Sequence, residues 1–342
     1  MFHPLYQMAS GRSRFLWWML GALLLLLGFG LGCWTHKNTT LGLFFSKEQH
    51  CLKPSGVNPR VSPEHVLDIL AYNVFMRPRW LFNDGQIPRT LRLPERIQGF
   101  DVLVLSEAFD TRARHYLLSK LRCIYPHQTS VLGRGHVWKI NGGVVVLSRW
   151  PIVQKKQIFF SNCSGTDCLS DKGVLYVKLL KGKRYIHLFA THLQAWDMLE
   201  SRSTRKKQFN SLGDFIQKQS IPAFEPVLIV GDLNVDKYAR SSEYKDALKS
   251  LQAGNPRQRG AQVFSMDTKR NGLVWSGKTE LLDYVLFSKR HLLPKDAWFE
   301  VLPLRSVKSW RRGFGNVSES FDLSDHFPVK GHFVFPKRTT DK

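Results

Sequence analysis

The chain has 342 residues, 43% hydrophobic and 23% charged, which is enough for one large α/β domain with a sizeable core. Its formal net charge of +23 favours polyanionic partners, namely nucleic acid, acidic polysaccharide or anionic lipid head groups, without choosing among them. The 5 cysteines are too sparse for a disulfide scaffold, and they do not show zinc-site spacing.

The first segment with a clear character is an apolar run at residues 15–35, behind a short basic tail at residues 1–14. At ~1.5 Å per helical residue, its length matches the thickness of the hydrocarbon layer of a membrane. We interpret it as a transmembrane signal anchor or, alternatively, as a long signal peptide. Both interpretations predict that the catalytic part is exported, either anchored to the membrane or secreted. An exported domain permits a disulfide, for which Cys163 and Cys168 are the favoured pair and Cys123 the alternative partner.

A polar lead-in at residues 36–64 precedes the predicted catalytic domain at residues 65–336, and residues 337–342 form a tail. Short apolar runs predict strands at residues 66–72, 101–105, 142–148, 173–180, 184–191, 227–230, 281–287 and 329–335. Apolar residues at helical spacing, or a proline at a helix start, predict helices at residues 94–99, 111–121, 199–219 and 241–251. The alternation of strands and helices is typical of a layered fold.

Polar side chains stand at or just beyond the ends of several predicted strands: Asn73, Glu107, His192, Asp232, Asn234, Asp325 and His326, with Asp283 inside another strand. Each alone has an ordinary explanation, such as a helix N-cap, a turn residue, a solvated acid or a structural histidine. Ligands of layered α/β folds bind where strand ends gather. The repeated pattern therefore favours one shared site.

The residue types at these ends suit metal-assisted hydrolysis of a phosphodiester. Glu107 would hold Mg²⁺, for which Mn²⁺ or Co²⁺ could substitute. Asp232 would hold the ion or a water, and the Asn234 amide would donate a hydrogen bond to a phosphoryl oxygen. One histidine would take a proton from water and the other would give one to the leaving alkoxide, while a buried aspartate would orient the base.

The motifs that contain these residues resemble the DNase I-like endonuclease/exonuclease/phosphatase superfamily over residues 66–335. In chain order they are Asn73, the Ser-Glu-Ala-Phe around Glu107, the Gly-Gly run at 142–152, Lys-Gly-Val-Leu-Tyr-Val-Lys at 172–178, Thr-His at 191–192, Gly-Asp-Leu-Asn at 231–234, Leu-Asp-Tyr-Val at 282–285 and Ser-Asp-His-Phe-Pro at 324–328. The segments at 125–134 and 172–178 resemble more narrowly the bacterial-type neutral sphingomyelinases, the sphingomyelinase C family.

The resemblance implies an α+β fold, a DNase I-like four-layer α/β/β/α sandwich with the site at one edge. It implies that His326 is the general base, that Asp283 orients it and that His192 protonates the leaving group. The implied metal and phosphate contacts are Glu107, Asn73, Asp232, Asn234 and Asp325.

The family's membrane-touching hairpin corresponds to residues 305–321, where Trp310 and Phe314 stand among basic residues. Aromatic rings among cations suit a membrane interface, so we predict membrane contact for both. The alternative is a solvated basic loop with one or two rings folded inward.

The resemblance further implies that a monomer hydrolyses sphingomyelin to ceramide and phosphocholine by in-line attack of a histidine-activated water. One alternative is an exported or anchored Mg²⁺-dependent nuclease, which the charge would suit but which has no obvious use for an anchor. The same fold would also serve a phospholipase C that acts on different phospholipids, or an adhesin without catalysis. The filled catalytic positions disfavour the adhesin, and nucleic acid is not the expected partner.

Overall fold

The structure is a computed structural model that describes residues 51–52, 62–135, 139–311 and 319–338. The predicted anchor at residues 15–35 and most of the predicted lead-in lie outside these residues. Within the described ranges, no helix is long and apolar enough to cross a membrane.

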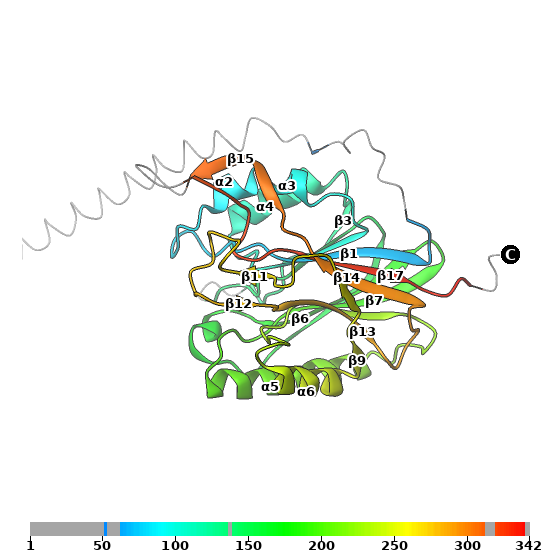
Figure 1. The fold of residues 1–342 in the computed structure, drawn as a ribbon. Coiled ribbons are helices and arrows are strands. Elements are labelled where there is room, and N and C mark those ends of the chain that lie inside the picture. Colours follow the sequence, from blue (N-terminus) through cyan, green and yellow to red (C-terminus); the bar gives the residue numbers. More distant parts are fainter. Residues whose placement is uncertain (1–50, 53–61, 136–138, 312–318, 339–342) are drawn as a thin grey trace, which may run out of the picture. The chain divides into compact units, whose positions relative to one another are not determined.

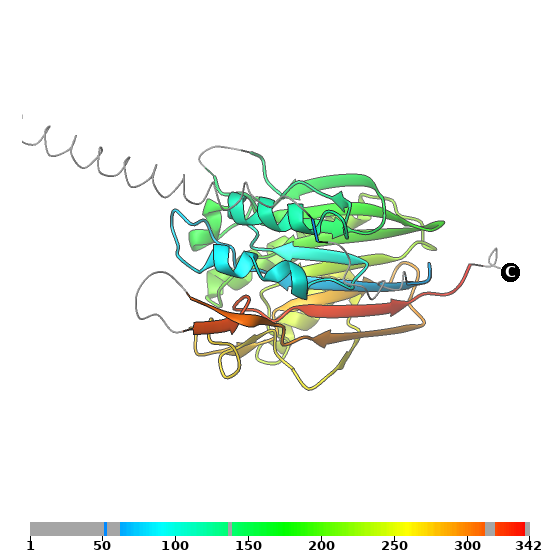
Figure 2. The same ribbon diagram turned by 90° about the horizontal axis from the view of Figure 1, so that it is seen from above.

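Two stacked β-sheets form the centre of the domain (Figures 1 and 2). The first sheet runs in the order β10 (Arg257–Arg259), β14 (Asp296–Val301), β17 (Val329–Val334), β1 (Val66–Asn73), β2 (Val102–Ser106), β4 (Val145–Ser148) and β3 (His127–Gln128). The second runs in the order β5 (Ile152–Phe159), β6 (Gly173–Lys181), β7 (Arg184–His192), β8 (Val227–Asp232), β13 (Asp283–Ser288) and β9 (Ala253–Gly254).

Helices cover the outer faces of both sheets (Figure 1). The first sheet carries α2 (Gln86–Thr90), α3 (Leu93–Arg96) and α4 (Thr111–Leu121), and the second carries α5 (Leu199–Gln217) and α6 (Ser241–Leu251). Two small ribbons pair β11 (Met266–Asp267) with β12 (Thr279–Glu280) and β15 (Arg305–Arg311) with β16 (Glu319–Asp322), and a 3-10 helix, η1, spans Gly165–Leu169. The prediction of a mixed α/β, DNase I-like fold is confirmed.

Strand β1 shows why the sequence forms these layers. Ile69 and Ala71 belong to the core cluster that also contains the second sheet, whereas Leu70 and Tyr72 pack into the cluster with the helices. Successive side chains of a strand point to opposite faces, so a strand buried on both faces must be continuously apolar. The apolar run of residues 69–72 in β1 is the consequence.

Strand β5 was missed by the sequence analysis because it has the opposite composition. Its residues Val153 to Gln157 are exposed, and it forms the edge of the second sheet. Lysine-rich edge strands do not need an apolar pattern, and their charges discourage pairing with other chains.

The prediction of membrane contact is wrong for Trp310 in the β15–β16 hairpin. Its side chain is 3% exposed, its ring packs against Gly85, and its indole nitrogen donates a hydrogen bond to the Asp322 carbonyl at 2.8 Å. A buried indole usually satisfies its N–H in this way. The alternative of a ring folded inward holds for Trp310, and Phe314 lies outside the described residues.

Two disulfides are present among the described cysteines. The predicted pair Cys163–Cys168 is confirmed, with a Cα–Cα distance of 5.1 Å. Cys123, which the sequence analysis considered as an alternative partner for that pair, bonds instead to Cys51, 72 residues earlier, with a Cα–Cα distance of 5.7 Å. This bond ties the start of the described chain to the turn after α4.

Candidate active site

The strand register places the predicted site residues of the second sheet next to one another at one edge of that sheet. Asp232 pairs in parallel with His192 of β7 and in antiparallel fashion with Asp283 of β13. Residues directly opposite on neighbouring strands have Cβ atoms ~4.5–5.5 Å apart. The three side chains, far apart in the sequence, are therefore immediate neighbours.

Asn73 links this edge to the first sheet. Its amide nitrogen donates hydrogen bonds to Glu107 Oε1 at 3.1 Å and to Asp232 Oδ2 at 3.0 Å. Its backbone carbonyl accepts a hydrogen bond from the Ser324 hydroxyl at 2.6 Å, just before Asp325 and His326. One buried amide thus joins the ends of β1, β2 and β8 and the loop that carries the second histidine.

His326 and Asp283 are in direct contact, with Nδ1 and Oδ2 2.6 Å apart. Both side chains are buried. Burial opposes the imidazolium, but the charge and hydrogen bond of Asp283, followed by the charges of Asp325 and Asp232, hold the pKa of His326 well above its ordinary value. The contact at Nδ1 fixes the ring, as expected of a base oriented by a carboxylate.

His192 has a different environment. Its Nε2 lies 3.3 Å from Lys172 Nζ and 3.7 Å from Asp232 Oδ2, and its buried Nδ1 has no hydrogen-bond partner among the described residues. Burial first, and then the positive charges of Lys172 and His326, hold the pKa of His192 well below its ordinary value. The free protein therefore does not store on His192 the proton that the predicted leaving-group acid must donate. The Lys172 ammonium beside it is a cation that the sequence analysis gave no role.

Buried and half-buried carboxylates gather around Asn73. Burial and the charge of Asp325 raise the pKa of Glu107 to about 7, and burial and the charge of Asp283 raise that of Asp232 to about 7. Burial also raises the pKa of Asp325. This concentration of negative charge, together with the buried Asp283 Oδ1 that has no partner in the described part of the chain, fits a hard divalent cation with oxygen ligands.

Two overlapping groups of residues could hold such a cation. The predicted group comprises Glu107, Asp232, Asn234 and Asp325. The geometry also brings ligand atoms of Asp232, Asp283 and His326 within 4.8 Å of one another. Because His326 and Asp283 already bind each other, we regard the first group as the better ion site and Asp232 as the residue shared by both.

The raised pKa values predict how metal should affect stability. In the metal-free protein, Glu107 and Asp232 hold protons up to about pH 7, compared with ordinary values of 4.5 and 3.8. The folded state then binds more protons than the unfolded state, so the free energy of unfolding should fall as the pH rises from about 4 to about 7. Mg²⁺ should offset this loss. At ~100-fold above its dissociation constant it should raise the melting temperature by roughly 5 °C or more at pH 8 and by less at pH 5.

Thermal unfolding of the full chain with Mg²⁺ and with EDTA at both pH values checks this expectation. The matched variants are Glu107→Gln, which should lose most of the effect, and Glu95→Gln on the exposed surface of α3, which should keep it. An equal rise in melting temperature with Mg²⁺ at pH 5 and at pH 8 would show that the protons held by Glu107 and Asp232 are not the source of the effect.

The Asn234 amide nitrogen donates a hydrogen bond to the Leu193 carbonyl at 3.0 Å, and its contact with a phosphoryl oxygen stays a prediction. Its backbone is left-handed, with φ 52°, as is that of Glu107, with φ 54°. Such backbone conformations cost energy in residues other than glycine and cluster at functional sites. Here the strain turns the chain sharply where each strand delivers its polar side chain.

Lys172, Asp167 and Arg89 also belong to the site, although sequence reasoning gave them no role. Lys172 Nζ donates to the Leu193 carbonyl at 2.7 Å and pairs with Asp167 Oδ2 at 2.7 Å, inside the Cys163–Cys168 loop. The fully buried Arg89 donates to the carbonyls of Val74 and Leu323, next to the two site loops. The Lys-Gly motif at 172–173 was a usable signal for Lys172, but Arg89 has none in the sequence.

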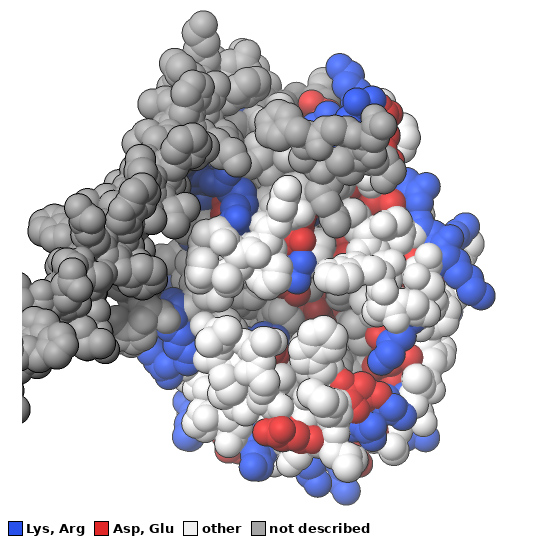
Figure 3. Space-filling model, turned by 90° about the vertical axis from the view of Figure 1, so that its left-hand side faces the viewer, with Lys and Arg blue, Asp and Glu red and all other residues white. Residues whose placement is uncertain are grey.

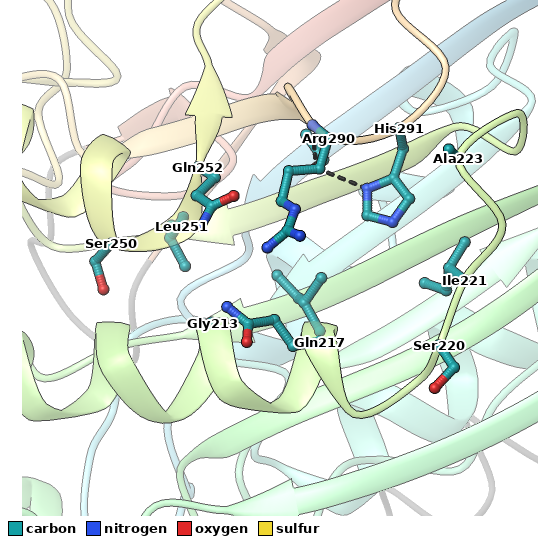
Figure 4. Close-up of a pocket in the computed structure, with 12 residues that line it drawn as sticks. Gly213, Gln217, Ser220, Ile221, Ala223, Ser250, Leu251, Gln252, Arg290 and His291 are labelled. Carbon is teal, nitrogen blue, oxygen red and sulfur yellow. Dashed lines mark hydrogen bonds between the residues drawn. The ribbon is translucent and has the colours of Figure 1, made fainter.

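The face at this edge has a hollow in which acidic atoms are visible, surrounded mainly by uncharged residues (Figure 3). A separate pocket of about 300 Å³ lies between α5, α6 and the end of β13, where Arg290 extends toward Gln217 (Figure 4). In it, the Ser288 hydroxyl and His291 Nδ1 are 2.8 Å apart. The predicted site residues do not line this pocket, so we place the chemistry in the hollow.

Comparison with known proteins agrees with the fold and the site. The pattern of the Endonuclease/Exonuclease/phosphatase family matches residues 70–326, which include the site from the end of β1 to His326. The chain therefore belongs to this family.

Among curated proteins, the chain is similar to bacterial sphingomyelinase C. The enzyme of Listeria ivanovii is 37% identical over 290 residues, covering 77% of this chain and 85% of that protein. One from Bacillus cereus is 35% identical over 297 residues, covering 78% and 88%. One from Leptospira interrogans is 40% identical over 306 residues, covering 81% of this chain but only 53% of that protein.

Solved structures show the same relationship. The crystal structure of SmcL has a TM-score of 0.74 and 36% identity, covering 79% of this chain and 100% of that one. Sphingomyelinase C from Streptomyces griseocarneus has a TM-score of 0.74 and 34% identity, covering 80% and 100%. A mutant beta toxin of Staphylococcus aureus with bound magnesium ions has a TM-score of 0.73 and 32% identity, covering 78% and 99%.

Proposed function

We propose that this protein is a metal-dependent phosphodiesterase that hydrolyses sphingomyelin to ceramide and phosphocholine. The observation that carries the proposal is the buried His326–Asp283 pair at one edge of the two sheets. At the same edge, Asn73 donates hydrogen bonds to the carboxylates of Glu107 and Asp232. The similarity to enzymes named sphingomyelinase C selects the lipid among possible phosphodiesters.

In the proposed reaction His326 is the general base. Asp283 holds Nδ1. The nearby carboxylates hold the pKa of His326 high, so the ring must first lose its proton. With the charges of Asp325 and Asp232 offset by a bound cation, that pKa would fall, and Nε2 would take a proton from the water that attacks phosphorus in line with the leaving ceramide oxygen. The carboxylate stabilises the imidazolium that forms. Asn73 positions the phosphate and the ligands.

The leaving oxygen needs a proton on the opposite side of the phosphate, and His192 is the proposed donor. Because its pKa is depressed, it must receive that proton during the reaction, and the Lys172 ammonium 3.3 Å away is placed to supply it or to stabilise the departing oxygen directly.

Glu107, Asp232, Asn234 and Asp325 would hold the cation, and the fit to Mg²⁺ rests on their oxygen ligands and surplus negative charge. Bound there, the ion would neutralise phosphate charge and polarise the P–O bond. Support for Mg²⁺ over other ions comes from the related toxin structure with bound magnesium; we propose Mn²⁺ and Co²⁺ as substitutes.

We further propose that the protein acts as a monomer, either anchored to the membrane or secreted, with the catalytic domain on the exported side. The apolar run at residues 15–35 and the two disulfides support this placement, since disulfides persist in oxidising compartments. Membrane contact by Phe314 also remains a proposal.

A side-by-side assay tests the proposed substrate. With Mg²⁺ present, the full chain is incubated with sphingomyelin vesicles, phosphatidylcholine vesicles and plasmid DNA, with His326→Ala as the inactive control. We expect release of phosphocholine from sphingomyelin at least ~10²-fold faster than from phosphatidylcholine, and intact plasmid; the specificity factor is an order-of-magnitude expectation for a site that hydrogen-bonds its substrate. Nicked plasmid with intact lipid would favour the nuclease, which the net charge of +23 also suits.

A further inference from the structure

The pocket between α5, α6 and the end of β13, which we call the α5–α6 pocket, takes no part in the proposed reaction. It lies at the Ser288 end of β13, whereas the site lies at the Asp283 end. The 6 residues of this strand, at ~3.3 Å each, span roughly 20 Å. With a volume of about 300 Å³, the pocket reaches the size of small-molecule binding sites. It is therefore a candidate for a second, separate binding site.

The α5–α6 pocket combines an apolar base with exposed polar groups. Its lining residues Leu251 and Ile216 are 4% and 6% exposed, and Ile221 is half-buried. The exposed lining residues include Gln217, Ser220, Gln252 and Arg290. Binding sites for small molecules commonly have this composition, because apolar contacts supply affinity and a few polar groups fix the orientation of the ligand.

The polar groups of the pocket are not used by the protein itself. The side chains of Gln217, Ser220, Gln252 and Arg290 make neither a hydrogen bond nor an ion pair within the described part of the chain. The Arg290 guanidinium extends toward Gln217 (Figure 4). His291 contacts Ser288 Oγ through Nδ1 at 2.8 Å, which leaves its Nε2 for a ligand. Several unused polar groups thus share one pocket.

Capping of the two helices does not explain the position of Arg290. A cation near helix C-termini often binds their last carbonyl groups. Here backbone N–H groups already do so, since Ser220 donates to the Gln217 carbonyl at 3.1 Å and Lys289 donates to the Gln252 carbonyl at 2.8 Å. The guanidinium is therefore left for a ligand.

The charges around the pocket favour an anion. Within the described ranges, no acidic side chain lines it. Exposed lysines are sequence neighbours of its lining residues: Lys218 follows Gln217, Lys249 precedes Ser250 and Lys289 precedes Arg290. Burial and then the charge of Arg290 hold the pKa of His291 below its ordinary value, which shows that the guanidinium acts on this side of the pocket. Cations gathered at one opening raise the local concentration of anions.

We propose that the α5–α6 pocket binds a tetrahedral oxyanion ester, either a phosphate monoester or a sulfate ester, on a small organic molecule. Arg290 would pair with two of the anionic oxygens, and the apolar base would contact the organic part. The amides of Gln217 and Gln252 and the hydroxyl of Ser220 would donate to the oxygens that remain. A carboxylate, with only two oxygens, would leave some of these donors unused. The proposal does not depend on the proposed function, because it uses none of the site residues.

The test is equilibrium binding of radiolabelled inorganic phosphate to the full chain in EDTA. The pocket variants are Arg290→Gln and Gln217→Ala, and the matched control is Arg257→Gln, which removes the same charge from an exposed position on β10. We expect Arg290→Gln to bind at least ~10-fold more weakly, Gln217→Ala about 3-fold more weakly and the control within about 2-fold of wild type. All three should unfold near the wild-type temperature, since exposed substitutions rarely change stability.

Competition against the labelled phosphate identifies the ester. Glucose 6-phosphate and glucose 6-sulfate differ only in the anionic group, so the stronger competitor names the class of ligand. Stronger competition by the first assigns the pocket to a phosphate monoester, and stronger competition by the second assigns it to a sulfate ester. Competition by both should weaken in parallel in Arg290→Gln, because the guanidinium serves either anion.

Four results would overturn the proposal. They are absence of phosphate binding to the wild type, equal affinity of the wild type and Arg290→Gln, equal weakening by Arg290→Gln and Arg257→Gln, and loss of binding in His326→Ala. The third would mean general attraction to a basic surface, and the fourth would place the phosphate in the active site. Hydrolysis of sphingomyelin by the wild type with Mg²⁺ is measured separately, so the proposed function can stand or fall independently of the pocket.

Discussion

The His326→Ala variant is expected to lose at least ~10²–10⁴-fold in kcat/KM on every phosphodiester substrate, the usual effect of removing a positioned proton-transfer group. The reason is that His326, oriented by Asp283 at 2.6 Å, activates the water whatever the leaving group is. His192→Ala should lose as much on sphingomyelin. It should recover most of its rate on a p-nitrophenyl ester, because p-nitrophenolate leaves without being protonated.

The measurement is kcat/KM of each variant on sphingomyelin and on the activated soluble ester. Lys172→Met provides the informative comparison, because Lys172 Nζ lies 3.3 Å from His192 Nε2. Recovery of Lys172→Met on the activated ester would place it on the leaving-group side with His192. Equal and undiminished defects of the two histidine variants on that ester would show that the assignment of base and acid is wrong.

The second large effect concerns the metal. Glu107→Ala, or removal of metal with EDTA, should lower kcat/KM by at least ~10³-fold, because a bound cation contributes several kcal/mol to stabilisation of the transition state. Mg²⁺ should restore the EDTA-treated wild type, whereas the variant should stay inactive at any accessible Mg²⁺ concentration. Zinc should not substitute, since the candidate ligands are oxygens.

Two controls make the result specific. Glu95→Gln removes an exposed acid on α3 and should keep full activity. Glu107→Gln keeps the size of the side chain and loses its charge, so it should resemble Glu107→Ala if the carboxylate is a ligand. Full turnover by metal-free wild type would remove the metal from the mechanism.

The spacing of apolar residues was enough to predict the layers of strands and helices, because it depends only on residues that are close in the sequence. A strand segment buried on both faces, such as residues 69–72 of β1 or 227–230 of β8, must be apolar, and α5 must carry Phe209 and Phe215 on its buried side. The same logic failed for β5, whose exposed edge position imposes no pattern. The aromatic residue Trp310 was misassigned because composition does not distinguish a ring turned to solvent from one packed on Gly85.

The sequence by itself determined which residue types stand at the strand ends. Asn73, Glu107 and Asp232 each follow or close an apolar run recognisable in isolation, His326 lies just before one, and the family motifs name them. Only the tertiary structure decided how they act. The Asn73 amide meets Glu107 and Asp232 from two different sheets, and Lys172 lowers the pKa of His192 that burial has already depressed. Hydrogen bonds and charges act through space over a few ångströms, and residues such as Asn73 and Asp232, which are 159 positions apart, reach that distance only after the two sheets have packed.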